Sequence, residues 1–320
     1  MIRQERPAVI WSTYPIATAH LIGWMLHRLT KVPWIADFRD PMVEYNDREN
    51  YYAPRNPSVR RARLRIERLC ARNAAYAVFC TPGARRIFID RYPDFPAHRA
   101  LVIPNGYDEA AFAGLNTAAP GDARAPNTPL TLLHSGVLYP GPDRDPSAFL
   151  NAVRQLIDES PEWKHRLRIR FRASGHTSTY SALIARLNLQ EIVELAPSVP
   201  YRNALAEMTA VDGLLVFQGY TSNPAIPAKV YEYLRARRPI LALVDAEGDT
   251  AALLHRLRVG TVLPIDESEA IKAGLDTFLR NLNAGTAAIL SAKDCQKFER
   301  ARGAAILAQI LDTITTDERR

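Results

Sequence analysis

A lysine and a glutamate stand near the predicted start of one helix, directly after a proline-rich loop. The loop is Asn223–Pro227 and the helix is expected near Ala228–Arg237, so Lys229 falls in its first turn and Glu232 one turn later. Unpaired N–H groups and the positive end of the helix dipole favour an anion there. Lys229 adds a charge, and Glu232 can accept hydrogen bonds from vicinal hydroxyls. A diphosphate attached to a ribose fits both groups. From the spacing alone, an ordinary exposed ion pair on a helix is the simpler interpretation.

The elements that must position this helix form a regular series. Short apolar strands alternate with helices along the chain, which is typical of parallel α/β sheets. In the second half, the predicted strands are Leu130–His134, Arg168–Ala173, Ile192–Ala196, Gly213–Gln218, Ile240–Val244 and Thr261–Pro264. The helices between and after them are expected near Pro146–Glu159, Ser178–Leu187, Tyr201–Met208, Ala228–Arg237, Thr250–Leu257 and Glu267–Asn281. Six such units make a complete doubly wound sheet, and the Lys229 loop leaves the carboxyl end of its fourth strand.

The first half contains fewer strands and begins abruptly in one of them. Its predicted strands are Ala8–Ser12, Trp34–Asp37, Tyr76–Cys80 and Leu101–Ile103, with helices near Ala17–Leu29, Ser58–Asn73 and Gly83–Tyr92. We expect a domain that is incomplete at its N-terminus, whose first strand is an aggregation-prone sheet edge.

A length of 320 residues also favours two domains. The expected organisation is a partial N-terminal domain at 1–116, a linker at 117–128, a C-terminal domain at 129–290 and a helical segment at 291–320, with helix near Ser291–Thr313.

Composition excludes several classes of protein. Apolar residues make up 47% and charged residues 23%, as in an ordinary globular chain and not a collagenous, coiled-coil or disordered one. The stretch Pro7–His27 lacks charged side chains, but it divides into a strand, a turn and a helix, which argues against a signal peptide or a membrane span. Cys70, Cys80 and Cys295 form no C-x-x-C pair, which indicates the reducing cytosol.

Positive charge is concentrated in the first half of the chain. Residues 1–115 carry 17 basic and 11 acidic side chains, against 24 and 23 in the remainder. One helical face carries four arginines, Arg61, Arg65, Arg68 and Arg72, and the opposite face carries Val59, Ala62, Ile66, Leu69 and Cys70. The arginines are suited to an anionic membrane surface, and a solvated face on a packed helix explains them equally well. No aromatic residues interleave with them, so nucleic acid is not an expected partner.

Several segments together resemble glycosyltransferase family 4, whose members have the two-domain GT-B fold. The Lys229 segment, from Pro227 to Tyr233 and on to Arg238-Pro239, resembles the family's Pro-x-Lys-x-x-Glu-Tyr donor motif. The other matching segments are Asp37-Phe38-Arg39-Asp40-Pro41, Pro104-Asn105-Gly106-Tyr107-Asp108 with Phe112, Leu133-His134-Ser135-Gly136 with Arg144, and Val199-Pro200-Tyr201 with Ala204-Leu205 and Met208. They occur in unbroken order over roughly residues 7–265. The resemblance implies an α/β fold with two Rossmann-like, doubly wound domains, of which the N-terminal one is the incomplete acceptor domain.

The resemblance also implies roles for individual residues. The backbone after Gly136, with Arg144 and Lys229, would hold the donor diphosphate, and Ser135, Gly136 and Ala228 would also contact the donor. Glu232 would bind the ribose, and the backbone of Pro197–Val199, including Val199, would face the base. Arg39 and Asp40 would lie near the sugar and the acceptor, and with Arg144 and Lys229 they form the expected catalytic set.

No metal or other cofactor is expected beside the nucleotide-sugar co-substrate. The sequence lacks a Walker A loop, a G-x-G-x-x-G after a strand, a G-x-S-x-G elbow and an H-E-x-x-H. Asp143-Arg144-Asp145 spells an Asp-x-Asp, which holds a divalent metal in some sugar transferases. Here it follows a Pro/Gly loop instead of a buried strand.

The expected function is a retaining, metal-independent transfer of sugar from a nucleotide sugar to a lipid-linked or polysaccharide acceptor. The protein would be cytoplasmic and peripheral on the inner face of a membrane. The alternative is a truncated, inactive homologue that binds a nucleotide or a partner protein. The missing N-terminal strands motivate it, as does Pro224, which stands where much of the family has a sugar-contacting Glu. A third possibility, a nucleotide-sugar epimerase, needs acidic and His groups at the sugar that the sequence does not supply.

Overall fold

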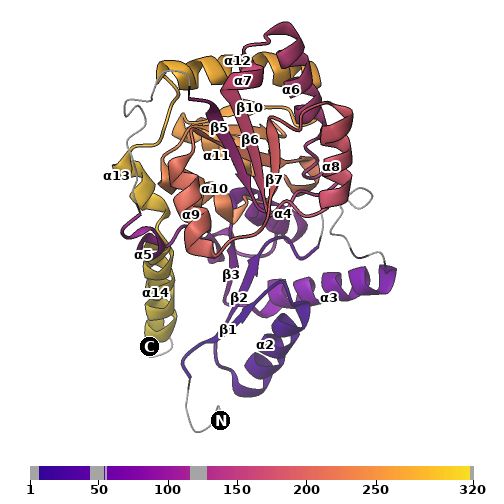
Figure 1. Cartoon of the computed structure of the whole chain (residues 1–320). Coiled ribbons are helices and arrows are strands. Elements are labelled where there is room, and N and C mark those ends of the chain that lie inside the picture. The colour runs from indigo at the N-terminus through magenta and orange to yellow at the C-terminus, as the bar shows by residue number, and fades with distance from the viewer. Residues whose placement is uncertain (1–6, 44–53, 55, 116–127, 318–320) are drawn as a thin grey trace. The chain divides into compact units, whose positions relative to one another are not determined.

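The chain divides into two compact units. The computed structural model describes residues 7–43, 54, 56–115 and 128–317 (Figure 1). Unit 1 comprises Met1–Asn105, Pro224–Ile226 and Arg300–Arg320, and unit 2 comprises Gly106–Asn223 and Pro227–Glu299. Apart from Thr128, the predicted linker lies outside the described residues.

Unit 1 is built on a four-stranded parallel sheet with its strands in chain order. The strands are β1 (Ile10–Thr13), β2 (Trp34–Arg39), β3 (Tyr76–Phe79) and β4 (Ala100–Val102). They are connected by α2 (Ala17–Thr30), α3 (Pro57–Asn73) and α4 (Pro82–Arg91), with the 3-10 turn η1 (Ala97–Arg99) before β4. Asn56 and Thr81 cap α3 and α4, and each cap is followed by a proline whose fixed φ suits a first helical position.

Both faces of this sheet are covered. On one face, Trp34, Phe38 and Phe79 pack with residues of α2, α3 and α4. On the other face, Ile35 and Val78 pack against the last described helix, α14 (Arg300–Asp317). The predicted closing helical segment is therefore interrupted. Its first part is α13 (Ala292–Cys295) and the 3-10 turn η3 (Gln296–Phe298) in unit 2, and its last helix completes unit 1.

Unit 2 is built on a six-stranded parallel sheet of order β10-β9-β8-β5-β6-β7. The strands are β5 (Leu130–Ser135), β6 (Leu167–Arg172), β7 (Val193–Ala196), β8 (Gly213–Gln218), β9 (Ile240–Val244) and β10 (Thr261–Leu263). The helices are α5 (Glu109–Phe112), α6 (Ser147–Glu159), α7 (Trp163–Arg166), α8 (Thr177–Arg186), α9 (Tyr201–Ala210), α10 (Ala228–Ala236), α11 (Asp249–Leu257) and α12 (Ser268–Ala284), with the 3-10 turn η2 (Tyr220–Ser222).

The strand order of unit 2 reverses between β5 and β8. From β5 the chain winds outward through β6 to β7, and from β8 it winds the opposite way to β10. Right-handed crossovers in opposite directions place helices on opposite faces, so central β8 is buried along its whole length. In open α/β sheets, ligands bind beyond the carboxyl ends of the strands at such a reversal. The loops after β5 and β8 are therefore where a site is expected.

The predicted strands and the main helices are all present, with bounds within a few residues of those expected. This confirms the α/β prediction, and the strand order of unit 2 shows that its sheet is doubly wound.

Candidate functional site

A glycine and a lysine meet at the carboxyl end of β5. Gly136 follows the strand with φ of +120°, and a β-carbon there would lie 2.6 Å from Lys229 Nζ. Any other residue would be strained and would push the lysine away. Gly136 therefore makes room for the Lys229 ammonium at the point where the strand order reverses.

Lys229 lies in the first turn of α10, after Pro227 and without a side-chain cap. Burial lowers the pKa of its ammonium to about 7; the Arg144 charge adds to this, while the Glu232 carboxylate opposes it. Lys229 therefore titrates near neutral pH. An anion bound beside it would restore its full charge.

His134, the next-to-last residue of β5, lies beneath this lysine and is 1% exposed. Its Nδ1 is 2.9 Å from the Leu215 carbonyl oxygen, and its Nε2 is 3.3 Å from Lys229 Nζ. Burial, and then the Lys229 charge, holds the pKa of this imidazole well below its ordinary value. The ring is therefore neutral at pH 7.

Glu232, one turn along α10, is also buried. The Tyr201 hydroxyl, at the start of α9, donates to Glu232 Oε1 at 2.7 Å, while the Tyr201 side chain is 51% exposed. Next to Glu232, the buried Tyr233 hydroxyl accepts a hydrogen bond from the Ser135 amide at 2.9 Å. Two neighbouring residues of α10 are thus fixed to α9 and to β5.

Arg144 lies in the loop between β5 and α6. Its Nε is 3.3 Å from Asp143 Oδ2, and its guanidinium carbon is 5.5 Å from the centre of the Tyr139 ring. Asp143 is buried and also accepts hydrogen bonds from the Thr221 and Ser222 hydroxyls. A buried carboxylate and an aromatic ring therefore hold the guanidinium.

The Asp143 loop approaches the end of β8 very closely at Gly219. The Gly219 amide donates to the Asp143 carbonyl, and a β-carbon on Gly219 would lie 1.7 Å from the Pro142 carbonyl oxygen. Only glycine permits this contact between the loops that follow β5 and β8.

The second aspartate of the Asp-x-Asp pattern is engaged by protein donors. Asp145 accepts hydrogen bonds from the Gly141 amide and from the amide and hydroxyl of Ser147. Within the described part of the chain, no cluster of three or more His, Cys, Asp or Glu residues could hold a metal ion. Asp143 and Asp145 shape the loop that carries Arg144.

Two amides expected near the diphosphate already have protein acceptors. The Ser135 amide donates to Tyr233, and the Gly136 amide donates to the Arg172 carbonyl oxygen at 2.8 Å. Ser135 and Gly136 therefore shape the site through their conformation, and their N–H groups do not face a ligand.

The turn predicted to face the base is held by an arginine. Arg172 donates to the Pro197 carbonyl oxygen at 2.8 Å, and both Arg172 and Arg170 pair with Glu207 of α9. Val199, two residues after Pro197, is half-buried.

The remaining two catalytic candidates lie in unit 1, at the end of β2. Arg39 is exposed, adopts a left-handed φ of +54°, and its carbonyl accepts from the Cys80 amide. Desolvation raises the pKa of the Asp40 carboxyl and of Asp37, and the Arg39 charge opposes both shifts. The structure describes these groups within unit 1, and the donor residues within unit 2.

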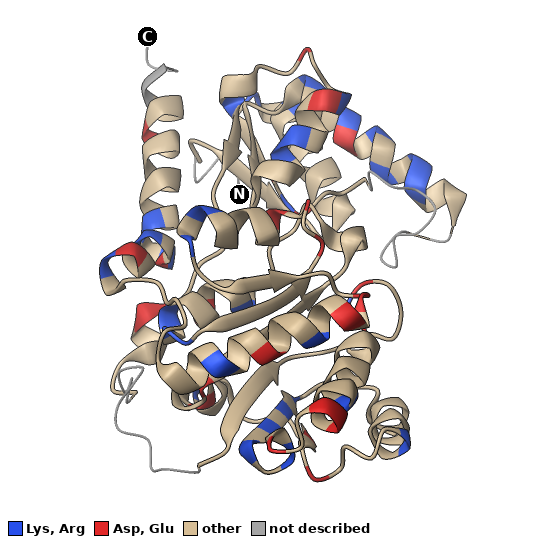
Figure 2. Ribbon diagram, turned by 90° about the horizontal axis from the view of Figure 1, so that it is seen from above, with Lys and Arg blue, Asp and Glu red and all other residues tan. Residues whose placement is uncertain are grey.

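The four arginines of α3 are all exposed, as the helical pattern predicts. Basic residues, blue in Figure 2, recur along this helix. Burial on the opposite face begins only toward the end of the helix. Val59 is 42% exposed and Ala62 is exposed, whereas Ile66 and Leu69 are half-buried and Cys70 is buried. The 17 residues of α3 span about 25 Å, and the apolar residues that it contributes to the core of unit 1, Ile66, Cys70 and Ala71, all lie in its second half.

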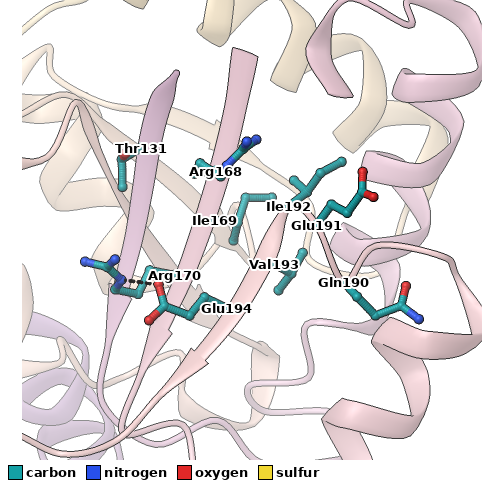
Figure 3. Close-up of a pocket in the computed structure, with 9 residues that line it drawn as sticks. All are labelled: Thr131, Arg168, Ile169, Arg170, Gln190, Glu191, Ile192, Val193 and Glu194. Atoms are coloured by element: carbon teal, nitrogen blue, oxygen red, sulfur yellow. Dashed lines mark hydrogen bonds and ion pairs between the residues drawn. The ribbon is translucent and has the colours of Figure 1, made fainter. Parts of the chain in front are cut away.

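A surface hollow of about 380 Å³ lies at the amino ends of β5, β6 and β7 (Figure 3). Its charged lining includes Arg168, Glu191 and the ion pair of Arg170 with Glu194, at 2.7 Å. It is at the opposite end of the strands from Lys229, so we do not assign it to the candidate site.

Unit 2 thus brings together Gly136, Arg144, Ala228, Lys229 and Glu232 from the predicted set. Sequence reasoning gave no role to His134, to Tyr233 or to the Tyr201 hydroxyl. The one cue for His134 was a polar residue inside an apolar strand, two residues before a glycine.

Comparison with known proteins identifies the type of domain and the fold. Residues 1–106 match the glycosyl transferase 4-like domain. Sucrose-phosphate synthase from Thermosynechococcus elongatus has a TM-score of 0.68 at 13% identity, covering 99% of this chain and 76% of its own. HepE from Anabaena, in complex with UDP, has a TM-score of 0.69 at 16% identity, covering 97% and 80%. A glycosyltransferase from Rickettsia africae has a TM-score of 0.69 at 12% identity, covering 98% and 78%.

No curated protein sequence matches the chain.

Among the described residues, no helix combines the length and the apolar character needed to cross a bilayer. The expected resemblance to glycosyltransferase family 4 is confirmed: residues 1–106 match a glycosyl transferase 4-like domain, and the chain has the GT-B fold of its structural neighbours.

Proposed function

We propose that unit 2 binds a nucleoside-diphosphate sugar and that the enzyme transfers the sugar to a lipid-linked or polysaccharide acceptor. The observation that carries this proposal is the approach of Lys229 to Gly136 at the strand-order reversal, with Arg144 and Glu232 beside it. HepE from Anabaena, a structural neighbour, is described in complex with UDP and with UDP-glucose, which supports a donor of this class.

Each part of the donor has a matching group. Lys229, Arg144 and the first turn of α10 at Ala228 bind the diphosphate, because two cations and a helix N-terminus favour its negative charge. Glu232 accepts hydrogen bonds from the ribose hydroxyls, and Tyr201 fixes its orientation. The backbone of 197–199, including Val199, faces the base.

The same cations serve the chemical step. As the bond between the anomeric carbon and the diphosphate breaks, negative charge grows on the leaving phosphate and positive charge on the sugar ring. Preorganised Lys229 and Arg144 stabilise the leaving group, so the reaction needs no metal. One such charged contact contributes about 1.5–3 kcal/mol, or roughly ten- to a hundredfold in rate. Arg39 and Asp40 act near the sugar and the acceptor, which attacks with retention of configuration.

The acceptor side involves unit 1. We assign contact with the anionic cytoplasmic face of a membrane to Arg61, Arg65, Arg68 and Arg72, which are all exposed. This location suits a glycolipid or polysaccharide acceptor and a cytoplasmic donor.

Binding and turnover test this proposal separately. UDP, GDP and ADP are titrated by calorimetry against the wild type, Glu232→Ala and a control, Glu269→Ala, whose carboxylate is exposed on α12. Release of the nucleoside diphosphate from the matching nucleotide sugars is then assayed with and without EDTA. We expect binding and EDTA-insensitive turnover, both reduced by Glu232→Ala and unchanged by Glu269→Ala.

The outcomes separate the candidate functions. Nucleotide binding without turnover of any nucleotide sugar would favour the alternative, an inactive homologue that binds a nucleotide. Absence of binding to all three nucleotides would overturn both.

A further inference from the structure

The hydrogen bonds of His134 determine which of its nitrogens carries the proton. Leu215 O lies 2.9 Å from Nδ1 and can only accept, so Nδ1 carries the proton. The ring is neutral because it is buried beside a cation. Its other nitrogen, Nε2, therefore presents a lone pair, 3.3 Å from Lys229 Nζ.

The lone pair of Nε2 can accept a hydrogen bond from Lys229. Two charged groups also act on the lysine. Arg144, on the loop after β5, repels the ammonium, and Glu232, on α10 itself, attracts it. Nζ lies against the end of β5 in the space that a β-carbon on Gly136 would take, 2.6 Å from that position. A hydrogen bond to a charged donor is among the stronger ones in proteins, so Nε2 favours one position and the charged state of the lysine.

We propose that His134 is a positioning residue of the donor site, which holds the Lys229 ammonium where the diphosphate binds. This inference rests on the proposed function. His134 is too deeply buried to touch the donor itself, and it acts through Lys229. The Leu215 bond fixes the ring, and the ring fixes the lysine.

Two amide variants separate positioning from structural support. Asn places its polar atoms at the δ position and can keep the hydrogen bond to Leu215, but it does not reach Lys229. Gln places its polar atoms at the ε position and can offer a carbonyl oxygen to Lys229, but it does not keep the Leu215 bond. A purely structural role for His134 predicts that His134→Asn is the milder change, and positioning of Lys229 predicts the opposite.

The probe is whichever of UDP-glucose, GDP-mannose and ADP-glucose binds the wild type most tightly. Their diphosphate diesters stay ionised from pH 6 to pH 8.5, so the protein alone titrates. We expect His134→Asn to bind the probe about tenfold more weakly at pH 8 and within about twofold at pH 6, as a one-unit fall in the pKa of Lys229 requires. His134→Gln should bind within about threefold at both values, because it keeps the hydrogen bond to the ammonium.

A double-variant cycle tests whether the effect passes through Lys229. In a Lys229→Met background, His134→Asn should weaken probe binding no further. An equal loss in both backgrounds would overturn the proposal, as would a loss that is the same at pH 6 and pH 8. Failure of the proposed function looks different, because then the wild type binds no probe or Lys229→Met binds it as tightly as the wild type.

A measurement without ligand covers the case in which a variant is unstable. The pKa of Lys229 is measured by competitive trace acetylation and mass spectrometry in the wild type and His134→Gln, with Lys293 as the internal reference. Thermal unfolding is followed in parallel. We expect the two proteins to give Lys229 the same pKa even if His134→Gln unfolds at a lower temperature. A fall of one unit or more in His134→Gln would contradict the role of Nε2.

Discussion

The two sheets of the molecule differ in where they place polar side chains. The strand order of unit 2 reverses between β5 and β8, and His134, Arg144, Lys229 and Glu232 come together there, from β5, the loop after it and α10. The four described strands of unit 1 run in chain order, and the four arginines of α3 lie on the exposed face of that helix. In unit 2 the reversal of strand order brings charged side chains into a partly buried site. In unit 1 the arginines of α3 stay on the surface of the helix. Changes confined to one unit should therefore alter the property of that unit and leave the other unchanged.

The largest expected effect concerns the surface of unit 1. Replacing Arg61, Arg65, Arg68 and Arg72 together by Ser should weaken binding to phosphatidylserine vesicles about a thousandfold at low salt, since each arginine near an anionic surface contributes about 1 kcal/mol. Nucleotide affinity should not change. The matched control replaces four exposed arginines of unit 2, Arg168, Arg186, Arg256 and Arg280. Co-sedimentation measures the partition, and an equal loss in both variants would mean that the effect is general charge.

Next in size is the close contact at Gly219. Gly219→Ala should lower the free energy of unfolding by about 2–4 kcal/mol, because its β-carbon would overlap the Pro142 carbonyl. Gly285→Ala, which has φ of +68° but nothing within 4 Å, should cost about 1–2 kcal/mol from backbone strain alone. Urea denaturation measures both variants, and equal losses would show that the loop can move aside.

Lys229→Met should weaken nucleotide-sugar affinity about ten- to a hundredfold, since a charged contact with the diphosphate is lost. The control is Lys272→Met in the same unit, whose lysine pairs with Glu159 and Glu269 on the surface. Calorimetry measures both. If the control lost as much affinity, the attraction would come from the overall charge of unit 2.

Affinity for a nucleotide sugar should also depend on pH. The folded protein holds the pKa of Lys229 at about 7, well below its ordinary value, so the charged form prevails below pH 7 and disappears above it. Affinity should therefore be constant at low pH and fall by up to about tenfold per pH unit above pH 7. Lys229→Arg, whose guanidinium stays charged, should flatten this profile. A flat profile in the wild type would contradict the assignment.

The smallest effect is expected from Tyr201→Phe, which removes one hydrogen bond to Glu232. The affinity for nucleotide should fall roughly fivefold, because a hydrogen bond of this kind contributes about 1 kcal/mol. Tyr76→Phe in unit 1 is the control and should leave nucleotide affinity unchanged. No change in Tyr201→Phe would show that burial alone orients Glu232.

The sequence predicts more of the fold than of the site. Strand β8 matches its predicted bounds because a short apolar run between turn residues fits a strand at the centre of a sheet, where both faces are buried. Lys229 and Glu232 could be predicted because helix spacing and a preceding loop are local features. The contact of Lys229 with His134 could not be, because it joins residues 95 positions apart. The exposure of Val59 could not be predicted for a similar reason: helical periodicity gives an apolar face but not how much of its length packs against the core.

The packing of α14 on unit 1 has a consequence for synthesis of the chain. Ile310, Leu311 and Ile314 cover a sheet whose strands were completed some 200 residues earlier. On the ribosome, unit 2 can therefore close while one face of the first sheet is still bare, and the N-terminal half finishes folding last. Contacts this distant in sequence form slowly. A truncation that removes α14 should therefore expose apolar surface on the sheet of unit 1, although that sheet lies some 200 residues earlier in the sequence.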